Sequence, residues 1–512
     1  MPALSRVSLF ALALCLTVPR VCGQEQPPPA TLADLQNRLA QIVQQPKYRA
    51  ALWGVKIASL DTGKTLFENN AEKLFSPASN SKLYTVALAM ERLGPDYRIR
   101  TSLYAQPHSI QDGVLRGDLI VFGRGDPTFN ARRNGGDVLK ALEPLASALT
   151  NAGIQRISGD LVGDSSYFRG PEYGSGWAWD DAENYYGAEI SSLTINDNVL
   201  SISILPGDAV SKPGNLLLSP SNSLVLMSNR TVTVAKDSRR RIDLYRPLGE
   251  NVIYVSGQIP LGDKGYEGDM PIHDPARLWI DLFEEVLAKD GVQVGGKLRT
   301  VDWMDRQAAP LDPGNLTELA SAESPPLREL AKEILKPSQN LYTDLLLAHI
   351  GESSRTNGDP AETTSEELGV RELNRFLAEV GVKPGETFFE EGSGLSRDNL
   401  VTPNATVALL QYMSRRGCSK DYIEALPVAG VDGTLRNRMK GTSAAGNVRA
   451  KTGSLRWASS LSGYVTSAAG EHLVFSLMVN RYQAGRGGGS ARADLDRIAE
   501  LLAKFAGRSE PQ

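Results

Sequence analysis

A serine and a lysine stand three residues apart in the segment FSPASNSKLYTVALAM, residues 75–90. A serine hydroxyl is a weak nucleophile until a base removes its proton. Lysine can be that base if burial and nearby positive charge lower its pKa enough to leave the amine neutral. Ser79 and Lys82 therefore suggest a nucleophilic enzyme. The pair alone is a weak signal, because serine often caps helices and lysine often lies on their surface.

The residues after this pair have the pattern of an amphipathic helix. Apolar side chains recur at helical spacing on one face, namely Leu83, Val86, Ala87, Met90 and Leu93. Gly94 and Pro95 predict its end. Ser79 is expected in its first turn, with Lys82 one turn further on the same side. A helix start also brings partial positive charge and free N–H groups to the serine, and both favour an anion.

Histidine, the usual base for a nucleophilic serine, is scarce. The chain has four histidines, and none stands beside an obvious orienting carboxylate in the sequence. A Ser-His-acid triad assembled from distant residues stays open as an alternative.

A second polar motif follows a predicted helix at residues 326–335. Pro337 is expected to interrupt the helical pattern. The tripeptide Ser338-Gln339-Asn340 is therefore predicted on a turn, from which side chains can project into a cleft.

A third motif, Lys451-Thr452-Gly453, lies within a predicted strand at residues 449–455. Glycine inside a strand lets a ligand approach the backbone, and a strand edge can pair with an extended peptide. We therefore expect this strand to help form the site.

Both ends of the chain predict parts of one domain. Residues 52–70 read as a β-hairpin, and three strands and a helix follow one another over residues 446–507. Between them, residues 97–306 alternate short strands with helices, which predicts one or two inserted mixed α/β domains. We expect a multidomain α+β or α/β fold, with the catalytic domain at residues 32–96 and 307–512.

The composition is that of an ordinary globular protein. Hydrophobic residues are 41%, charged residues 22% and the formal net charge is -4, so nucleic acid is not indicated as the main partner. Of three cysteines, Cys15 and Cys22 lie in the N-terminal segment, which leaves Cys418 without a disulfide partner. The acidic segment WAWDD has no histidine near it and reads as a solvated loop. We expect no metal and no cofactor.

The first residues predict export. Arg6 precedes the apolar stretch at residues 9–18. The segment VCG, which ends at Gly23, has small or medium-sized residues at the positions that precede a signal-peptidase cleavage site. Residues 1–23 are interpreted as a cleaved signal peptide and residues 24–31 as a linker, which predicts a periplasmic or extracytoplasmic protein. An uncleaved N-terminal anchor is the alternative.

Ser-x-x-Lys, Ser-x-Asn and Lys-Thr-Gly, in that order, are the signature of serine acyltransferases that handle D-Ala-D-Ala and β-lactams. The segments SPASNSKL, KPSQNLY, EGSGLSRDN, LPVAGVDGTLRNRM, GTSAAGNVRAKTGSL and SSLSGYV resemble the class C low-molecular-mass penicillin-binding proteins of the DacB type. These are D-alanyl-D-alanine carboxypeptidase/endopeptidases. The insert segments GRGDPTF, GDLVGDSSYF and GWAWDD are similar to that family too. The first two motifs lie 338 − 79 = 259 residues apart, a separation typical of this family and absent from ordinary β-lactamases.

The resemblance implies a role for each motif residue. Ser79 would be the nucleophile and Lys82 its general base, while Ser338 and Asn340 would relay protons and hold the substrate amide. The terminal carboxylate of D-Ala would bind the residues of the late strand, and backbone N–H groups would form the oxyanion hole. On that strand, Lys451 and Thr452 would bind the carboxylate, with Gly453 beside them. The N–H groups of Ser454 and Ser79 would together form the oxyanion hole.

Two further assignments follow from the same resemblance. Asp164 and Arg397 resemble positions by which this family grips the free end of a diaminopimelate side chain. A carboxylate for its ammonium and a guanidinium for its carboxylate would suit that zwitterion. A turn aspartate and a solvated arginine are the alternative interpretation.

The expected activity is therefore a serine-type D-Ala-D-Ala carboxypeptidase, with crosslink-cleaving endopeptidase activity as a second reaction. Peptidoglycan stem peptides are the expected partners and β-lactams the expected covalent inhibitors, with no nucleic acid and no stable transmembrane anchor. A β-lactamase with the same acylation machinery is one alternative, and a wall-binding or β-lactam-sensing module with a silent site is another. A homo-oligomer stays open.

Overall fold

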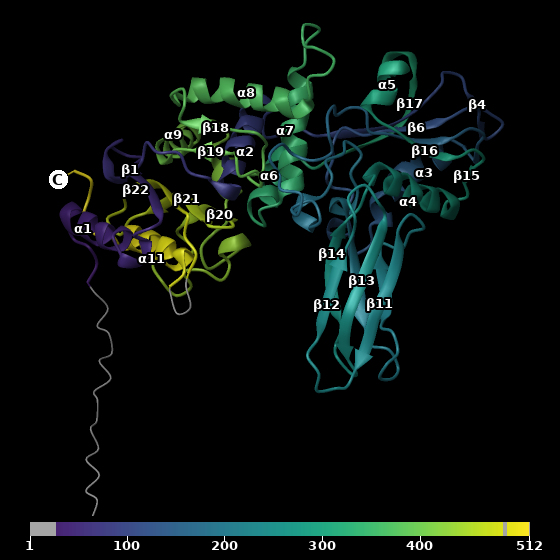
Figure 1. Cartoon of the computed structure of the whole chain (residues 1–512). Coiled ribbons are helices and arrows are strands. Elements are labelled where there is room, and N and C mark those ends of the chain that lie inside the picture. The colour runs from purple at the N-terminus through teal and green to yellow at the C-terminus, as the bar shows by residue number, and fades with distance from the viewer. Residues whose placement is uncertain (1–26, 485–488, 511–512) are drawn as a thin grey trace, which may run out of the picture.

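The computed structural model describes residues 27–484 and 489–510. The predicted signal peptide lies outside these residues. A five-stranded antiparallel sheet, in the order β2-β1-β22-β21-β20, joins strands from both ends of the chain. Figure 1 shows the purple and yellow strands side by side. Its strands are β1 (Leu52–Ser59), β2 (Thr65–Asn69), β20 (Arg449–Leu455), β21 (Ala458–Thr466) and β22 (His472–Asn480).

Helices cover both faces of this sheet because its strands bury side chains on both sides. Along β22, Val474 and Met478 belong to one core, and Phe475 and Leu477 to the other. The second core is covered by α1 (Leu32–Val43) and α11 (Ala491–Lys504). The helices that share the first core are α2 (Ser81–Arg92), α6 (Leu327–Leu335), α7 (Asn340–Ser354), α8 (Ser365–Val380), α9 (Pro403–Met413) and α10 (Ser419–Glu424).

The middle of the chain forms its own core with further sheets. One sheet has the order β16-β8-β6-β3-β17 and another the order β15-β7-β5-β4. The helices here are α3 (Glu143–Asn151), α4 (Pro275–Lys289) and α5 (Trp303–Ala308). The strands are β3 (Arg100–Ala105), β4 (Ile110–Gln111), β5 (Val114–Leu115), β6 (Leu119–Phe122), β7 (Arg156–Ile157), β8 (Leu161–Asp164), β15 (Gln293–Val294), β16 (Leu298–Val301) and β17 (Thr317–Glu323).

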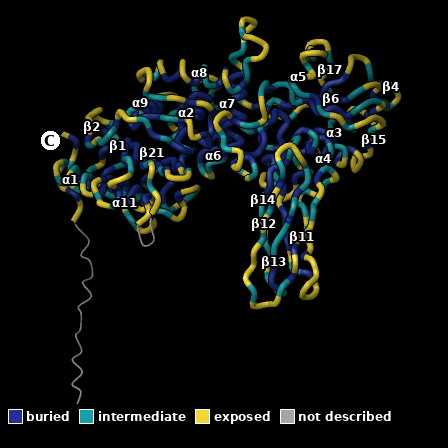
Figure 2. The backbone as a smooth tube through the Cα atoms, viewed as in Figure 1, coloured by how far each residue is buried: buried dark blue, intermediate teal, exposed yellow. Residues whose placement is uncertain are grey.

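A long two-sheet lobe projects from this middle part (Figure 1). One sheet pairs β9 (Val199–Leu205) with β10 (Asn215–Ser219) and β14 (Tyr266–Pro271), and the other pairs β13 (Val252–Pro260) with β11 (Leu226–Val234) and β12 (Arg241–Tyr245). The tip of the lobe is largely exposed (Figure 2). A short ladder of β18 (Thr387–Phe388) and β19 (Leu400–Val401) belongs to the catalytic part instead.

Strand pairing bears on the boundary between the insert and the catalytic part, which we expected at residue 306. Strand β17 pairs with β3 over residues 317–323 and 100–105, so the sheet of the insert continues beyond that boundary. We propose that the insert spans residues 97–323 and that residues 32–96 and 324–510 form the catalytic part. The expected mixed fold, with an antiparallel catalytic sheet flanked by helices, is confirmed.

Candidate active site

Ser79 lies on a tight turn immediately before α2. A short 3₁₀ helix spans Ala78–Asn80, and the backbone of Ala78 is left-handed at φ 49°. The turn is held against the sheet because the Ser460 hydroxyl donates to the carbonyl of Pro77 at 2.7 Å. Gly453 lies opposite, where a Cβ would come within 2.5 Å of that same carbonyl oxygen. The glycine of the Lys-Thr-Gly motif thus makes room for the turn of Ser79, and its expected role in admitting a ligand stays a prediction.

The amine of Lys82 is fully buried and contacts three segments of the chain. Its Nζ lies 3.1 Å from Ser79 Oγ, 2.6 Å from Asn340 Oδ1 and 2.6 Å from the carbonyl oxygen of Ser393. The Asn340 amide is oriented by its Nδ2, which donates to the Tyr186 carbonyl at 2.9 Å. Asn340 Oδ1 and the Ser393 carbonyl oxygen can only accept hydrogen bonds from the lysine. A neutral amine would give its two N–H groups to these acceptors and turn its lone pair toward Ser79, as a general base requires.

Electrostatics also favour a base that titrates near neutral pH. Burial lowers the pKa of the Lys82 ammonium to about 8, while the nearby carboxylates of Asp344 and Glu391 act in the opposite direction. Desolvation therefore outweighs the attraction of two acidic groups, and a modest rise in pH frees the base.

The second lysine lies on β20, beside the turn that follows α6. Lys451 Nζ donates to Ser338 Oγ at 2.8 Å and to the Thr452 carbonyl at 2.8 Å. Ser338 has a left-handed backbone with φ 69°, and Asn340 begins α7. Ser338 thus lies on the predicted turn, while Asn340 is already helical. Burial, with added repulsion from Lys82, holds the pKa of Lys451 well below its ordinary value.

An open cleft of about 660 Å³ connects these groups. Residues of all three motifs line it, namely Ser79, Ser338, Asn340, Thr452 and Ser454. The two lysines lie buried directly behind this lining. The Thr452 hydroxyl, which bonds to Thr434 Oγ1 at 2.8 Å, forms part of the wall. The three motifs therefore meet at one site, although they are far apart in the sequence.

Asp164 and Arg397, the two residues predicted to bind a diaminopimelate side chain, lie in different parts of the structure. Arg397 lines the cleft and its Nη1 lies 2.8 Å from Asp181 Oδ2. Asp164 instead ends β8 inside the insert, is fully buried and pairs with Arg306 at 2.6 Å. It is not among the residues that line the cleft, and its strand packs against α4. The acid that accompanies Arg397 is Asp181, in the WAWDD segment that we had interpreted as a solvated loop.

The chain matches the D-Ala-D-Ala carboxypeptidase 3 (S13) family over residues 35–503. It is 32% identical to a D-alanyl-D-alanine carboxypeptidase of Actinomadura sp. (strain R39), over 94% of this chain and 87% of the relative. It belongs to the S13 family. A solved structure of penicillin-binding protein 4 (dacB) from Haemophilus influenzae is similar at a TM-score of 0.77 and 25% identity, over 91% of this chain and 98% of that one. A further relative, the DacB carboxypeptidase of the same species, is 27% identical over 83% of this chain and 85% of its own length.

One buried carboxylate of this S13 peptidase organises the loop that holds the base. Glu391 accepts hydrogen bonds from the backbone N–H of Ser393 at 2.9 Å, from that of Gly394 at 2.7 Å and from Asn399 Nδ2 at 2.7 Å. It also accepts from the Ser393 hydroxyl and, at 3.4 Å, from the indole of Trp177. These hydrogen bonds hold the loop so that the Ser393 carbonyl faces the amine of Lys82. The EGSGLSRDN segment contributes to the family resemblance, but nothing in the sequence alone indicates a role for this glutamate.

Gly394 brings the same loop against the nucleophile turn. Its φ is 82°, and a Cβ would lie 2.0 Å from the Ala78 carbonyl oxygen. Only glycine fits this contact without displacing the turn. The loop thus contacts the turn of Ser79 through Gly394 and the amine of Lys82 through the Ser393 carbonyl.

We predict that acylation of the S13 peptidase by penicillin follows the titration of Lys82. The base works only when neutral, so the rate should rise with pH, pass its midpoint near about pH 8 and level off above it. Stopped-flow measurement of acylation across this range tests the expectation. A rate that does not change between about pH 6 and 9 would rule out Lys82 as the titrating base.

We predict two effects of Glu391→Gln on the same acylation profile. Loss of a charged acceptor should loosen the loop and lower the plateau by about tenfold or more. Loss of a negative charge near Lys82 should lower the pKa of that amine and move the rising limb to lower pH. Glu390→Gln, an exposed neighbour with the same change of charge, is the control. A lowered plateau with an unmoved limb would leave Glu391 a purely structural role.

Proposed function

We propose that this protein is a serine-type D-Ala-D-Ala carboxypeptidase that works through an acyl-enzyme on Ser79. The contact that carries the proposal is that of the buried Lys82 amine with the Ser79 hydroxyl at 3.1 Å, in a cleft that all three motifs line. Membership of the S13 family supports the substrate class. The relatives match over the insert as well, which favours a peptidase over a β-lactamase.

The reaction begins with proton transfer from Ser79 Oγ to Lys82 as the oxygen attacks the carbonyl of the penultimate D-Ala. Negative charge then develops on the carbonyl oxygen, where the N–H groups of Ser79 and Ser454 would stabilise it. Collapse expels terminal D-Ala, whose nitrogen takes a proton through Lys82 and Ser338. Water then hydrolyses the ester and frees Ser79.

The terminal carboxylate of the substrate would bind beside Lys451 and Thr452. In the unliganded cleft burial disfavours a charged Lys451. A carboxylate placed there would restore that charge, and the field of the charged Lys451 would in turn help to keep Lys82 neutral. Substrate binding would thus prepare the base.

The outer part of the cleft suits a zwitterionic side chain. Asp181 and Arg397 form a partly exposed ion pair there, which the ammonium and carboxylate of a diaminopimelate side chain could exchange for new partners. We propose this pair in place of Asp164 and Arg397. The same subsite would serve cleavage of D-Ala–diaminopimelate crosslinks, the endopeptidase reaction.

We propose an extracytoplasmic, periplasmic location with a cleaved export signal at residues 1–23. The charged residue and short apolar stretch of that segment support it. Within residues 27–484 and 489–510, no helix has the length and apolar character needed to cross a bilayer. Peptidoglycan stem peptides would then be accessible as substrates.

Replacement of the nucleophile tests the mechanism directly. The purified protein should release D-Ala from a muropeptide pentapeptide, and Ser79→Ala should abolish this release, as followed by chromatography and mass spectrometry. Intact-mass measurement with penicillin should show a long-lived adduct on Ser79. Rapid turnover of the drug would indicate a β-lactamase, and full peptidase activity in Ser79→Ala would overturn the mechanism.

A matched pair of aspartate variants tests the side-chain subsite. Asp181→Asn should raise KM for a diaminopimelate-containing peptide about tenfold, because it removes one charged partner in the cleft. Asp164→Asn should lower Tm through the broken buried pair with Arg306 and leave that KM unchanged. The reverse result would restore Asp164 to the subsite.

A further inference from the structure

The catalytic cleft continues into a second groove on the side of Thr452. This groove has a volume of about 510 Å³ and shares two lining residues, Pro337 and Thr434, with the cleft. Thr434 also contacts the proposed carboxylate site, because its Oγ1 lies 2.8 Å from Thr452 Oγ1. The groove therefore begins where the carboxylate of the leaving residue would bind.

The walls of the groove are fixed by contacts within the chain. One wall is Lys336 at the end of α6, and the other is the short 3₁₀ turn Gly433–Leu435. The Thr434 N–H donates to the Lys336 carbonyl at 2.9 Å, and Lys336 Nζ pairs with Asp432 Oδ2 at 2.6 Å. A Cβ on Gly433 would come within 2.5 Å of that same carbonyl oxygen. These contacts pre-form the groove, which lowers the entropic cost of binding a ligand.

Three arginines border the groove and the adjoining end of the cleft. Arg436 lines the groove, whereas Arg438 and Arg492 line the cleft. Arg436 and Arg438 follow Thr434 within four residues. Arg438 pairs with Asp496 of α11, and Arg492 lies one turn before Asp496 on the same side of that helix. All three arginines therefore come from segments beside the junction of cleft and groove.

These arginines have N–H groups available for a ligand. The exposed side chains of Arg436 and Arg492 have no hydrogen bond or ion pair among the described residues. Arg438 uses Nε and Nη2 on Asp496, while its Nη1 has no partner among those residues and is not fully buried. The one acid among the described residues that line the groove, Asp432, is neutralised by Lys336. The groove therefore favours an anion, and carboxylates match guanidinium groups in geometry.

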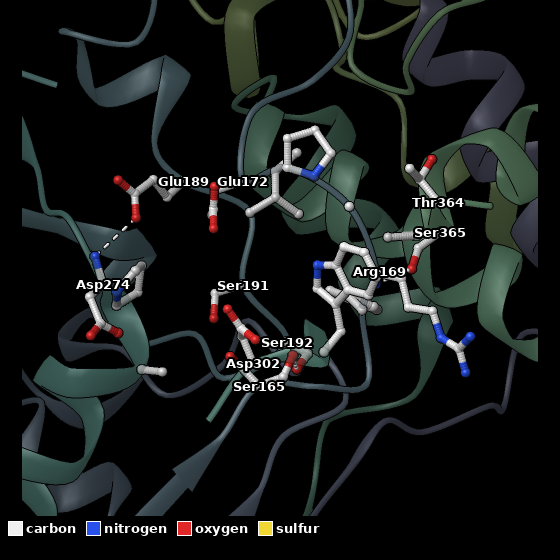
Figure 3. A pocket seen from close by; sticks show the side chains of 18 of the residues that line it. Ser165, Arg169, Glu172, Glu189, Ser191, Ser192, Asp274, Asp302, Thr364 and Ser365 are labelled. Carbon is white, nitrogen blue, oxygen red and sulfur yellow. Dashed lines mark hydrogen bonds between the residues drawn. The ribbon is translucent and has the colours of Figure 1, made fainter. Parts of the chain in front are cut away.

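A cavity elsewhere in the protein shows the opposite situation (Figure 3). It lies between the insert and the catalytic part and has a volume of about 240 Å³. Glu189, one of its acids, accepts from the Asp274 N–H at 2.9 Å, and the Arg169 N–H donates to the Ser365 hydroxyl at 2.7 Å. Polar groups paired in this way need no ligand, in contrast to the free arginines beside the groove.

We propose that this groove is the subsite for the peptide strand that leaves when a crosslink is cut, and that Arg436, Arg438 and Arg492 bind the carboxylates of that strand. The inference rests on the proposed peptidase function. When terminal D-Ala leaves, the leaving residue ends at the carboxylate beside Lys451 and Thr452. In a D-Ala–diaminopimelate crosslink the leaving nitrogen belongs to diaminopimelate, whose chain continues into a second stem peptide with free carboxylates of its own. Only the crosslinked substrate therefore reaches the groove.

Binding to Ser79→Ala protein tests this subsite without turnover. The ligands are a crosslinked muropeptide dimer and the same dimer with the carboxylates of its leaving strand amidated beyond the crosslinking residue, and both are titrated by calorimetry. Arg436→Gln is added to the Ser79→Ala protein. Arg415→Gln, at an exposed arginine that lines neither the cleft nor the groove, is the matched control. Because the assay needs no acyl-enzyme, its failure is separable from a failure of the parent enzyme to release D-Ala.

We expect Arg436→Gln to weaken binding of the dimer with free carboxylates about tenfold and to leave binding of the amidated dimer unchanged, because a charge-assisted contact is lost. Arg492→Gln should act alike, and serves if Arg436→Gln does not fold. The proposal is overturned if the two dimers bind Ser79→Ala protein equally, if Arg436→Gln weakens both alike, or if Arg415→Gln has the same effect. It is also overturned if the dimer does not bind up to about 10 mM, a range that covers weak sites.

Discussion

The buried amine of Lys82 is the contact on which the rest of the catalytic structure depends. It lies among Ser79, Asn340 and the Ser393 carbonyl, which come from three distant parts of the sequence. Two of these atoms can only accept, so a neutral lysine has one orientation, with its lone pair on the serine. The two acceptors that cannot donate thereby set the direction of proton transfer, and burial sets the pH at which it begins.

Much of the surrounding architecture maintains that geometry. Hydrogen bonds to Glu391 hold the loop whose Ser393 carbonyl faces Lys82, and Gly394 allows that loop to pack against the turn of Ser79. Gly453 allows β20 to approach the same turn from the other side. Ser79, the proposed nucleophile, therefore lies on a turn with a left-handed residue at Ala78. Close backbone contacts hold this turn, and a methyl group added at Gly394 or Gly453 would displace it.

The insert also takes part in the active site. The carbonyl of Tyr186 orients the Asn340 amide, and the indole of Trp177 reaches Glu391. Asp181 from the same segment meets Arg397 in the cleft. The insert thus contacts both the proposed base, through Asn340, and the proposed outer subsite, which gives a physical reason for such a long insertion within one catalytic domain.

The sequence by itself determined the local elements and the chemical types of the site. The alternation of the hairpin at residues 52–70, the helix after Ser79 and the strand of Lys451 follow from hydrophobic periodicity and turn residues, which act over short distances. The three motifs in order indicated the class of serine acyltransferases, and the further matching segments indicated the family. These features need no knowledge of distant contacts.

Only the tertiary structure decided which acid accompanies Arg397, why Gly453 is glycine, and which residues direct the amine of Lys82. From the sequence we expected Asp164, yet Asp164 is buried against Arg306, whereas Asp181 lines the cleft and pairs with Arg397. Burial and pairing are set by packing between segments hundreds of residues apart. Local patterns carry no information on that packing, and it is this packing that sets the pKa of Lys82 and the shape of the cleft.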